Sequence, residues 1–325
     1  MLKEDTVLVL GAGASQHLDI PVGRSLIFRM ESTIAKYEDE IFDAINRIQE
    51  EVGTDDPKIA RHDVGPTMED FGPTVRRSNL PSIDHFLKLN PGLRTVGRVV
   101  IAATLLDAED GEKVAMREQG PSWLEYVWQT YLLDLRESGT GNLRIITLNY
   151  DRSVEYFIRT SLGSMYGEGI DELDIDTLIE SFDINHLHGS LGSLDAVPYG
   201  AEIERSRAGV DLLIRAAAGI VLLDDDCSPQ NYSAAQSTLR RARQIGFLGF
   251  GFDLEVLGRM FYQTRKIGTL DPSEPPPNLF GTAVGLTNTR RDEVNELLNK
   301  RLNGRSVVFG KGNCLDLVRD SKLLA

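Results

Sequence analysis

The sequence is short of cysteine and of long apolar runs, and each shortage excludes a class of protein. Cys227 and Cys314 are the only cysteines among 325 residues, too few for a disulfide framework and without the paired spacing of a zinc site. Apolar stretches such as Val99 to Leu106 and Ala216 to Leu223 fall far short of the roughly 20 residues that a membrane-spanning helix needs. We therefore expect a cytoplasmic protein that binds no metal and does not enter a membrane.

Basic residues are also scarce. Lysine and arginine number 35 against 49 aspartates and glutamates, which gives a formal net charge of -14. Nucleic-acid backbones and anionic membrane surfaces attract basic proteins, so direct nucleic-acid binding is not expected. The remaining composition, with 41% hydrophobic residues, is that of a globular chain able to bury a sizeable core.

Short apolar runs that alternate with helical patterns predict an α/β fold. The run from Val7 to Leu10 ends in a glycine-rich turn, which is typical of a buried first strand. Five further predicted strands are Leu143 to Leu148, Asp183 to Leu187, Ile245 to Phe250, Thr282 to Leu286 and Ser306 to Phe309. Because candidate helices follow several of them, we predict a single domain over residues 1–325, built on a Rossmann-like parallel sheet with helices on both faces.

Residues 22–140 are predicted to form a helical module inserted after the first strand. Apolar residues recur every three or four positions from Val22 to Val52, which predicts one long helix. Shorter helical patterns cover Ser82 to Leu89, Thr95 to Leu106 and Ser122 to Leu135. Residues 53–81 carry Asp-Pro and Gly-Pro breaks, and we interpret them as a long loop that serves as a lid or an oligomer contact.

Gly11-Ala12-Gly13-Ala14-Ser15 follows the first predicted strand and is the first candidate ligand site. Glycines let backbone N–H groups approach a phosphate closely, and the motif precedes the long predicted helix, whose N-terminal dipole favours anions. The third glycine of the dinucleotide fingerprint is missing, because position 16 is Gln16. The alternative is a tight strand-to-helix turn without a ligand.

Two more strand ends carry candidate catalytic residues. Asn149 and Asp151 lie in Thr147-Leu-Asn-Tyr-Asp151, where an aspartate is equally typical of a helix N-cap and an asparagine of a turn. His186 and His188 stand two apart in a predicted strand, so the two rings can share a face. A histidine there suits a general base better than a metal ligand, and a ring that only hydrogen-bonds a loop is the structural alternative.

Gly249-Phe-Gly251-Phe-Asp253 and Thr287-Asn288 complete the set. The first is another glycine-rich exit from an apolar run, with Asp253 placed to cap the next helix. The carboxyl ends of parallel strands meet at one edge of a sheet, so these features are expected to converge on a single extended ligand.

Four of these motifs, taken in order, resemble the nucleotide site of the SIR2 (sirtuin) superfamily: Gly11 to Ser15, Thr147 to Asp151, His188-Gly189 and Gly249 to Asp253. The resemblance is closest to bacterial SIR2-like NAD-consuming proteins of anti-phage defence, in which a segment like Ser82-Ile-Asp-His-Phe-Leu87 also appears. It implies that Asn149 and His188 are catalytic and that Asp151 lies near the nicotinamide, whereas His186 matches no required position. The residues expected to bind NAD are Gly11, Ala12, Gly13, Ser15, Arg24, Asp151, Gly249, Gly251, Asp253 and Asn288.

Two departures from the family favour NAD hydrolysis over protein deacylation. Deacylating sirtuins hold a structural zinc with two Cys-x-x-Cys pairs that this chain lacks, and their Gly-Ile-Pro-Asp-Phe-Arg segment is replaced by Leu18-Asp-Ile-Pro-Val-Gly23. The expected protein is an NAD hydrolase that releases nicotinamide and ADP-ribose as a triggered, NAD-depleting effector. The alternatives are a deacylase, a non-catalytic sensor of NAD or ADP-ribose, and a dehydrogenase, which Gln16 disfavours. The resemblance also implies a homo-oligomer and an activating partner in trans, of the ATPase or Argonaute type.

Overall fold

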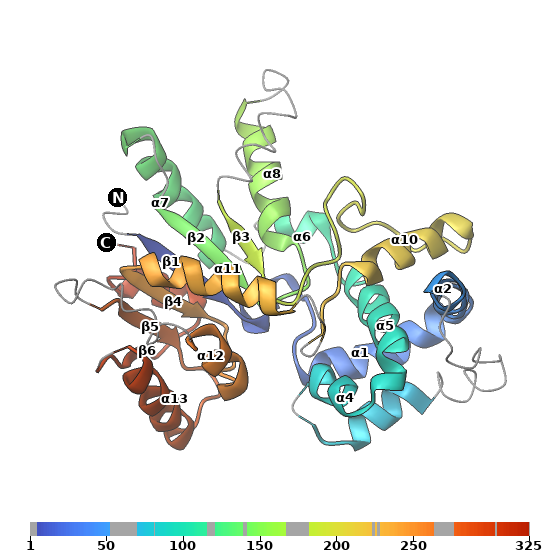
Figure 1. Cartoon of the computed structure of the whole chain (residues 1–325). Helices are drawn as coiled ribbons and strands as arrows, with labels where there is room; N and C mark the ends of the chain where they lie inside the picture. The colour runs from blue at the N-terminus through green and yellow to red at the C-terminus, as the bar shows by residue number, and fades with distance from the viewer. Residues whose placement is uncertain are drawn as a thin grey trace.

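A computed structural model describes residues 5–52, 70–80, 82–115, 121–138, 142–166, 182–222, 225, 228–262, 276–302 and 304–324. Six parallel strands form one open sheet in the order β3-β2-β1-β4-β5-β6 (Figure 1). The strands are β1 (Thr6–Leu10), β2 (Leu143–Thr147), β3 (Ile184–His186), β4 (Gln244–Leu248), β5 (Asn278–Thr282) and β6 (Val307–Gly310). The order reverses between β1 and β4, which is where doubly wound sheets bind their ligands. The predicted Rossmann-like α/β fold is confirmed.

Both faces of the sheet are covered by helices, as predicted. Successive residues of β1 point to opposite faces, so Val7 and Val9 enter one core while Leu8 and Leu10 enter the other. The first core is closed by α11 (Ser228–Arg241), α12 (Leu254–Met260) and α13 (Asn288–Arg301). The second is closed by α7 (Trp123–Ser138), α8 (Ser153–Tyr166) and α14 (Cys314–Asp320).

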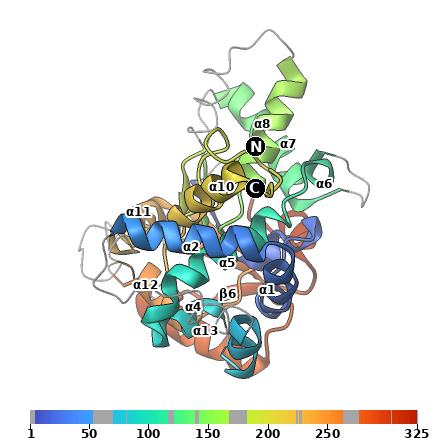
Figure 2. The same cartoon turned by 90° about the vertical axis from the view of Figure 1, so that its right-hand side faces the viewer.

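A third core belongs to a group of helices beyond the carboxyl ends of the strands, seen at the right of Figure 1. The group consists of α1 (Arg24–Lys36), α2 (Glu38–Val52), α4 (Ile83–Leu89), α5 (Arg94–Leu106) and α10 (Arg207–Ala218), with α2 running across the front of Figure 2. This group and the predicted insert at residues 22–140 overlap only in part. The short α6 (Gly111–Ala115) contacts α8 and α7 covers the sheet, while α10 joins the group from beyond β3.

The long helix predicted from Val22 to Val52 is wrong as a single element, because the chain breaks at Tyr37. This residue leaves the helical conformation, and its hydroxyl donates to Asp107 Oδ1 at 2.8 Å. A new helix then starts with Glu38, Asp39 and Glu40, whose charges suit a helix N-terminus. Apolar periodicity continues across the break and so does not reveal it.

The loop predicted at residues 53–81 lies largely outside the described residues, which begin again at residue 70 and omit Pro81. Residues 70–77 are helical, so that part of the loop prediction is wrong. The predicted cap at Ser82 is confirmed, since its hydroxyl accepts the His85 N–H at the start of α4. The loop's proposed role as a lid stays a prediction.

The fifth strand is shifted from its predicted place. The sequence pattern suggested Thr282 to Leu286, whereas β5 ends at Thr282 and the apolar residue Val284 is 75% exposed beyond it. Gly281 interrupts the apolar residues of the true strand, so a search for apolar runs does not find it. It is needed because a Cβ there would lie 2.9 Å from the Phe252 ring and 3.0 Å from Val307.

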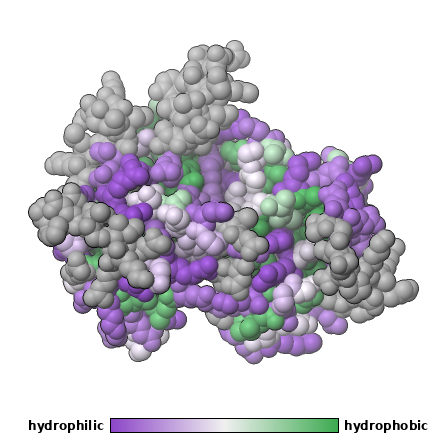
Figure 3. All heavy atoms as spheres, in the orientation of Figure 1, coloured by the Kyte–Doolittle hydropathy of each residue, from purple (hydrophilic) through white to green (hydrophobic). Residues whose placement is uncertain are grey.

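The surface in Figure 3 is mostly hydrophilic, with separate apolar patches. Among the helices of the described ranges, none has both the length and the apolar character needed to cross a membrane.

Candidate active site

The glycine turns after β1 and β4 pack directly against each other at the point where the strand order reverses. Gly11 N–H donates to Leu248 O and Gly13 N–H donates to Gly249 O, both at 3.0 Å. A Cβ on Gly249 would lie 2.0 Å from the backbone nitrogen of Ala14. These glycines are therefore required by backbone packing, and two of the N–H groups expected to receive a phosphate are already bonded within the fold.

The helix-dipole argument for the Gly11 to Ser15 motif is wrong. Two 3-10 turns, η1 (Ala12–Ala14) and η2 (Gln16–Leu18), separate β1 from α1, so the motif does not open the long helix. Arg24 is the exposed first residue of α1, and its side chain has no hydrogen bond or ion pair with any described residue. The positions left open to a ligand are Ala12 and Gly251. Both are exposed, and a Cβ at Gly251 would meet no atom within 4 Å.

Three predicted site residues form one buried hydrogen-bonded chain. Asn149 Nδ2 donates to Ser15 Oγ at 3.1 Å, and Ser15 Oγ donates to Asp151 Oδ1 at 3.2 Å. All three are less than a tenth exposed. Asp151 also accepts the Ser153 N–H at 3.2 Å, the N–H of the first residue of α8. The N-cap position belongs to Arg152, whose carbonyl accepts the Tyr156 N–H, so the proposed N-cap role of Asp151 is wrong by one residue. The adjacent ends of β1 and β2 thus bring distant segments together.

Two candidate catalytic atoms are buried without a partner. Asn149 Oδ1 and His188 Nδ1 have no hydrogen bond to any described protein atom, although both residues are largely buried. Leaving such a group unpaired costs about 1–3 kcal/mol, so a functional explanation is called for. Asn149 Oδ1 is free to accept a hydrogen bond from a bound molecule, and His188 Nδ1 is free to accept or donate one according to its tautomer.

The buried His188 ring lies beside two tyrosine rings. The ring centroids of Tyr150 and Tyr232 are each 6.3 Å from its own. Burial is the main cause that lowers the pKa of His188 below its ordinary value; Asp84 opposes the shift and Arg259 adds to it. The ring is therefore neutral at pH 7 and able to accept a proton.

His186 does not share a site with His188. β3 ends at His186, and the His186 ring turns to α8, where Nε2 lies 2.5 Å from Glu155 Oε1. Its Nδ1 lies 3.0 Å from the Asn149 carbonyl oxygen. Within the ranges that the structure describes, no group of three or more His, Cys, Asp or Glu side chains is arranged to hold a metal ion.

The two remaining predicted contacts lie at helix starts. Asp253 caps α12 by accepting the N–H groups of Glu255 and Val256, as its cap alternative proposed, and its Oδ2 lies 3.6 Å from His85 Nε2 on α4. Asn288 was placed at a strand end on the mistaken bounds of the fifth strand. It is the exposed first residue of α13, six positions beyond the end of β5.

Sequence reasoning missed several residues around His188. Tyr150 O–H donates to Asp84 Oδ1 at 2.7 Å, which brings the Ser82 to Leu87 segment to the site. The sequence marked that segment as part of the SIR2 resemblance but assigned no role to its residues. Tyr232 on α11 and Arg259 on α12 stack at 4.5 Å from the charged carbon to the ring centroid, and no local pattern marks either of them.

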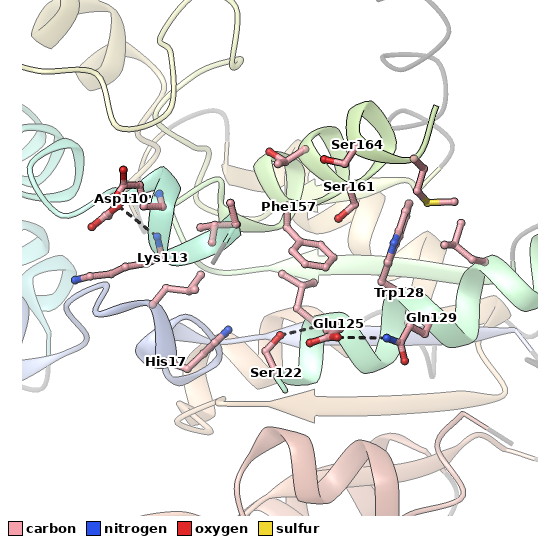
Figure 4. Close-up of a pocket in the computed structure, with 18 residues that line it drawn as sticks. His17, Asp110, Lys113, Ser122, Glu125, Trp128, Gln129, Phe157, Ser161 and Ser164 are labelled. Carbon is pink, nitrogen blue, oxygen red and sulfur yellow. Dashed lines mark hydrogen bonds between the residues drawn. The ribbon is translucent and has the colours of Figure 1, made fainter. Parts of the chain in front are cut away.

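A separate cavity of about 560 Å³ lies between α6, α7 and α8 (Figure 4). Its lining includes His17, Lys113, Trp128 and Phe157 but none of the predicted site residues. No protein-family model and no curated protein matches this chain. The geometry of the site offers a neutral buried base, a hydrogen-bonded amide and an open glycine position at one sheet edge.

Proposed function

We propose that this chain is an NAD hydrolase that cleaves the bond between nicotinamide and ribose. The observation that carries the proposal is the pair of buried, unpartnered atoms, Asn149 Oδ1 and His188 Nδ1, at the carboxyl ends of neighbouring strands. Both belong to residues that the SIR2 resemblance marks as catalytic. A molecule that satisfies these atoms recovers the free energy that they cost the fold.

The residues present fit the parts of NAD. The nicotinamide end would meet amide, hydroxyl and carboxylate groups, which come from the hydrogen-bonded series of Asn149, Ser15 and Asp151. Ala12 and Gly251 leave room at the switch point for a diphosphate to approach the backbone. Gly11, Gly13 and Gly249 contribute by holding the two turns together, because their own packing is already complete.

The proposed chemistry needs one base and precise positioning. Breaking the nicotinamide–ribose bond builds positive charge on the sugar, and the bonding electrons leave with nicotinamide, which departs as a neutral molecule without a general acid. Water supplies the hydroxyl group that adds to the ribose carbon. His188 takes the proton released by that water and passes it to solvent, while Asn149 orients the water or the ribose. The products are nicotinamide and ADP-ribose.

The direct test follows nicotinamide and ADP-ribose from purified full-length protein supplied with NAD. We expect His188→Ala and Asn149→Asp to lower kcat by at least about 100-fold, because one removes the base and the other, at the same size, loses the Nδ2–Ser15 bond that orients Oδ1 and adds a negative charge. Asp211→Asn is the control, since it breaks the Arg47–Asp211 ion pair in the helical group, outside the site. Equal turnover in all four proteins would refute the assignment.

Two other outcomes would favour the alternatives. Turnover of an acylated peptide that depends on Asn149 would make the protein a deacylase. Binding of ADP-ribose without any nicotinamide release would make it a non-catalytic sensor. The defence role, homo-oligomer and activating ATPase or Argonaute-type partner rest on the resemblance alone. NAD depletion confined to infected cells would support the defence role, and the mass of the purified protein in solution tests the homo-oligomer.

A further inference from the structure

Asn149 has four polar atoms, and the fold fastens three of them. Its N–H donates to Thr147 Oγ1 at 3.0 Å, and its Nδ2 donates to Ser15 Oγ at 3.1 Å. Its carbonyl oxygen lies 3.0 Å from Nδ1 of His186. Oδ1 alone is left without a partner. His186 therefore supplies the only contact that fixes the carbonyl side of this residue among the described atoms.

The geometry requires two protons in the His186–Glu155 contact. Both ring nitrogens face oxygens, the Asn149 carbonyl on one side and Glu155 Oε1 at 2.5 Å on the other. A neutral imidazole carries one N–H and donates to only one of them, so the second proton lies either on the ring, as an imidazolium, or on Glu155. The two side chains are only 13% and 17% exposed, so the pair is shielded from solvent.

The surrounding charges favour the ion pair. Burial alone would lower the pKa of His186, but the Glu155 carboxylate, the Asn149 carbonyl and Asp151 together raise it above the ordinary value. Burial would likewise raise the pKa of Glu155, but His186 and Arg152 lower it. From α11, Asn231 donates to the backbone oxygens of His186 and Leu187 and carries no charge.

We propose that His186, held as an imidazolium by Glu155, is a positioning residue that fixes Asn149 for the reaction. This inference rests on the proposed NAD hydrolysis for its kinetic consequence. If the ring loses a proton, the remaining one stays on Nε2 with the carboxylate, and the Nδ1 lone pair then faces the Asn149 carbonyl. The contact between His186 Nδ1 and the Asn149 carbonyl oxygen then changes from attractive to repulsive, which disturbs the orientation of the free Asn149 Oδ1.

The pH profile of kcat follows from the two histidines. His188 must be neutral, so activity falls as the pH drops through its lowered pKa, on the acid side of its ordinary value near 6.5. His186 must be protonated, so activity falls as the pH rises through its raised pKa. The stability that the His186 proton contributes has the same sign, being complete below the unfolded pKa and lost as the pH rises through the folded one.

The kinetic test compares His186→Ala with His186→Asn and Glu155→Gln. We expect His186→Ala to lower kcat by roughly 10- to 100-fold with little change in KM, in the range that small misplacements cost. His186→Asn places an amide donor near the Nδ1 position, so it should restore most of kcat and abolish the alkaline fall. Glu155→Gln lets a neutral ring donate to Asn149 and should abolish that fall too. A merely structural histidine would not alter the pH profile, and Asp211→Asn again serves as the control.

A second measurement keeps the inference separate from the proposed function. Histidine-labelled protein is titrated by NMR, with His186 assigned by the signal missing from His186→Asn. Because the pKa of His186 is raised above 6.5, the ring is expected to be mainly an imidazolium at pH 6.5 and to become mainly neutral there in Glu155→Gln. A neutral wild-type ring, or an active protein in which His186→Ala matches the control, would overturn the inference. If wild-type protein does not cleave NAD, the proposed function fails, and the NMR signal of the Asn149 side-chain amide then tests the positioning role of His186. A shift of that signal in His186→Ala that is reversed in His186→Asn supports the positioning role. No shift in His186→Ala overturns it.

Discussion

At the scale of single residues, the candidate site is organised around which polar atoms are bonded and which are free. Ser15 is central because its hydroxyl both accepts from Asn149 and donates to Asp151, so one oxygen joins the turns after β1 and β2. The neutral, partner-free Nδ1 of His188 contrasts with His186, whose two ring nitrogens are both engaged. Two histidines two positions apart therefore have opposite electrostatic roles.

Replacing Ser15 by alanine tests this organisation. Ser15→Ala removes the acceptor for Asn149 Nδ2 and a donor to Asp151, so we expect kcat for NAD cleavage to fall about 10-fold or more and the protein to lose about 1–3 kcal/mol of unfolding free energy. Ser32→Ala is the matched control, because that exposed serine bonds only to the Arg29 carbonyl in its own helix. Steady-state kinetics and urea unfolding provide the two measurements. Unchanged kcat in Ser15→Ala would separate this hydrogen-bonded chain from catalysis.

The convergence of Ser15, Asn149 and Asp151 was predictable from the sequence, because each follows an apolar run and parallel strands end at the same sheet edge. Asp84 and Tyr232 were not predictable. They reach His188 from α4 and α11, and only the packing of the helical group on the sheet decides which of their neighbours they meet. Local patterns contain no information on such distant contacts.

At the scale of elements, the glycine motifs turn out to have two different functions. Gly11, Gly13 and Gly249 let two turns approach to backbone contact, whereas Gly251 occupies open space. The sequence shows the same residue type in both settings, so it cannot separate packing from ligand binding. The same limit explains why the helix break at Tyr37 and the strand containing Gly281 were misplaced, since each depends on a tertiary partner.

A pair of alanine substitutions distinguishes the two functions. Gly249→Ala places a Cβ 2.0 Å from the Ala14 nitrogen at a residue with φ of 57°, so we expect it to cost about 3 kcal/mol or more of unfolding free energy. Gly251→Ala meets no neighbour and should leave stability within about 0.5 kcal/mol, while raising KM for NAD if the diphosphate approaches there. Thermal unfolding and NAD titration measure the two effects. Equal stability losses would contradict the packing assignment.

At the scale of the whole molecule, a buried ion pair connects the helical group to the candidate site. Arg152, the residue after Asp151, is 1% exposed and forms a bidentate contact with Glu109, with distances of 3.2 and 2.6 Å, in the segment between α5 and α6. Arg152 also donates to the Val197 carbonyl, and Glu109 accepts the Gly200 N–H at 3.2 Å. Two separate segments, at Glu109 and at residues 197–200, are thus held against the start of α8 around one guanidinium.

Breaking this pair should destabilise the entire fold. Burial raises the pKa of Glu109 to about 7 even beside Arg152. In Arg152→Met this carboxyl is left with the Gly200 N–H as its main donor, and it must either stay charged without its partner or take up a proton, so we expect a loss of about 3–5 kcal/mol in unfolding free energy. Glu109→Gln removes the charge while keeping an acceptor for Gly200. In the double variant the uncompensated charge is gone, and its loss should therefore be smaller than the sum of the two single losses by at least about 1 kcal/mol. Urea unfolding followed by both fluorescence and circular dichroism checks this, because coincident transitions establish that one free energy describes the molecule. Strictly additive losses would show that Arg152 acts through its carbonyl contacts and not through the charge of Glu109.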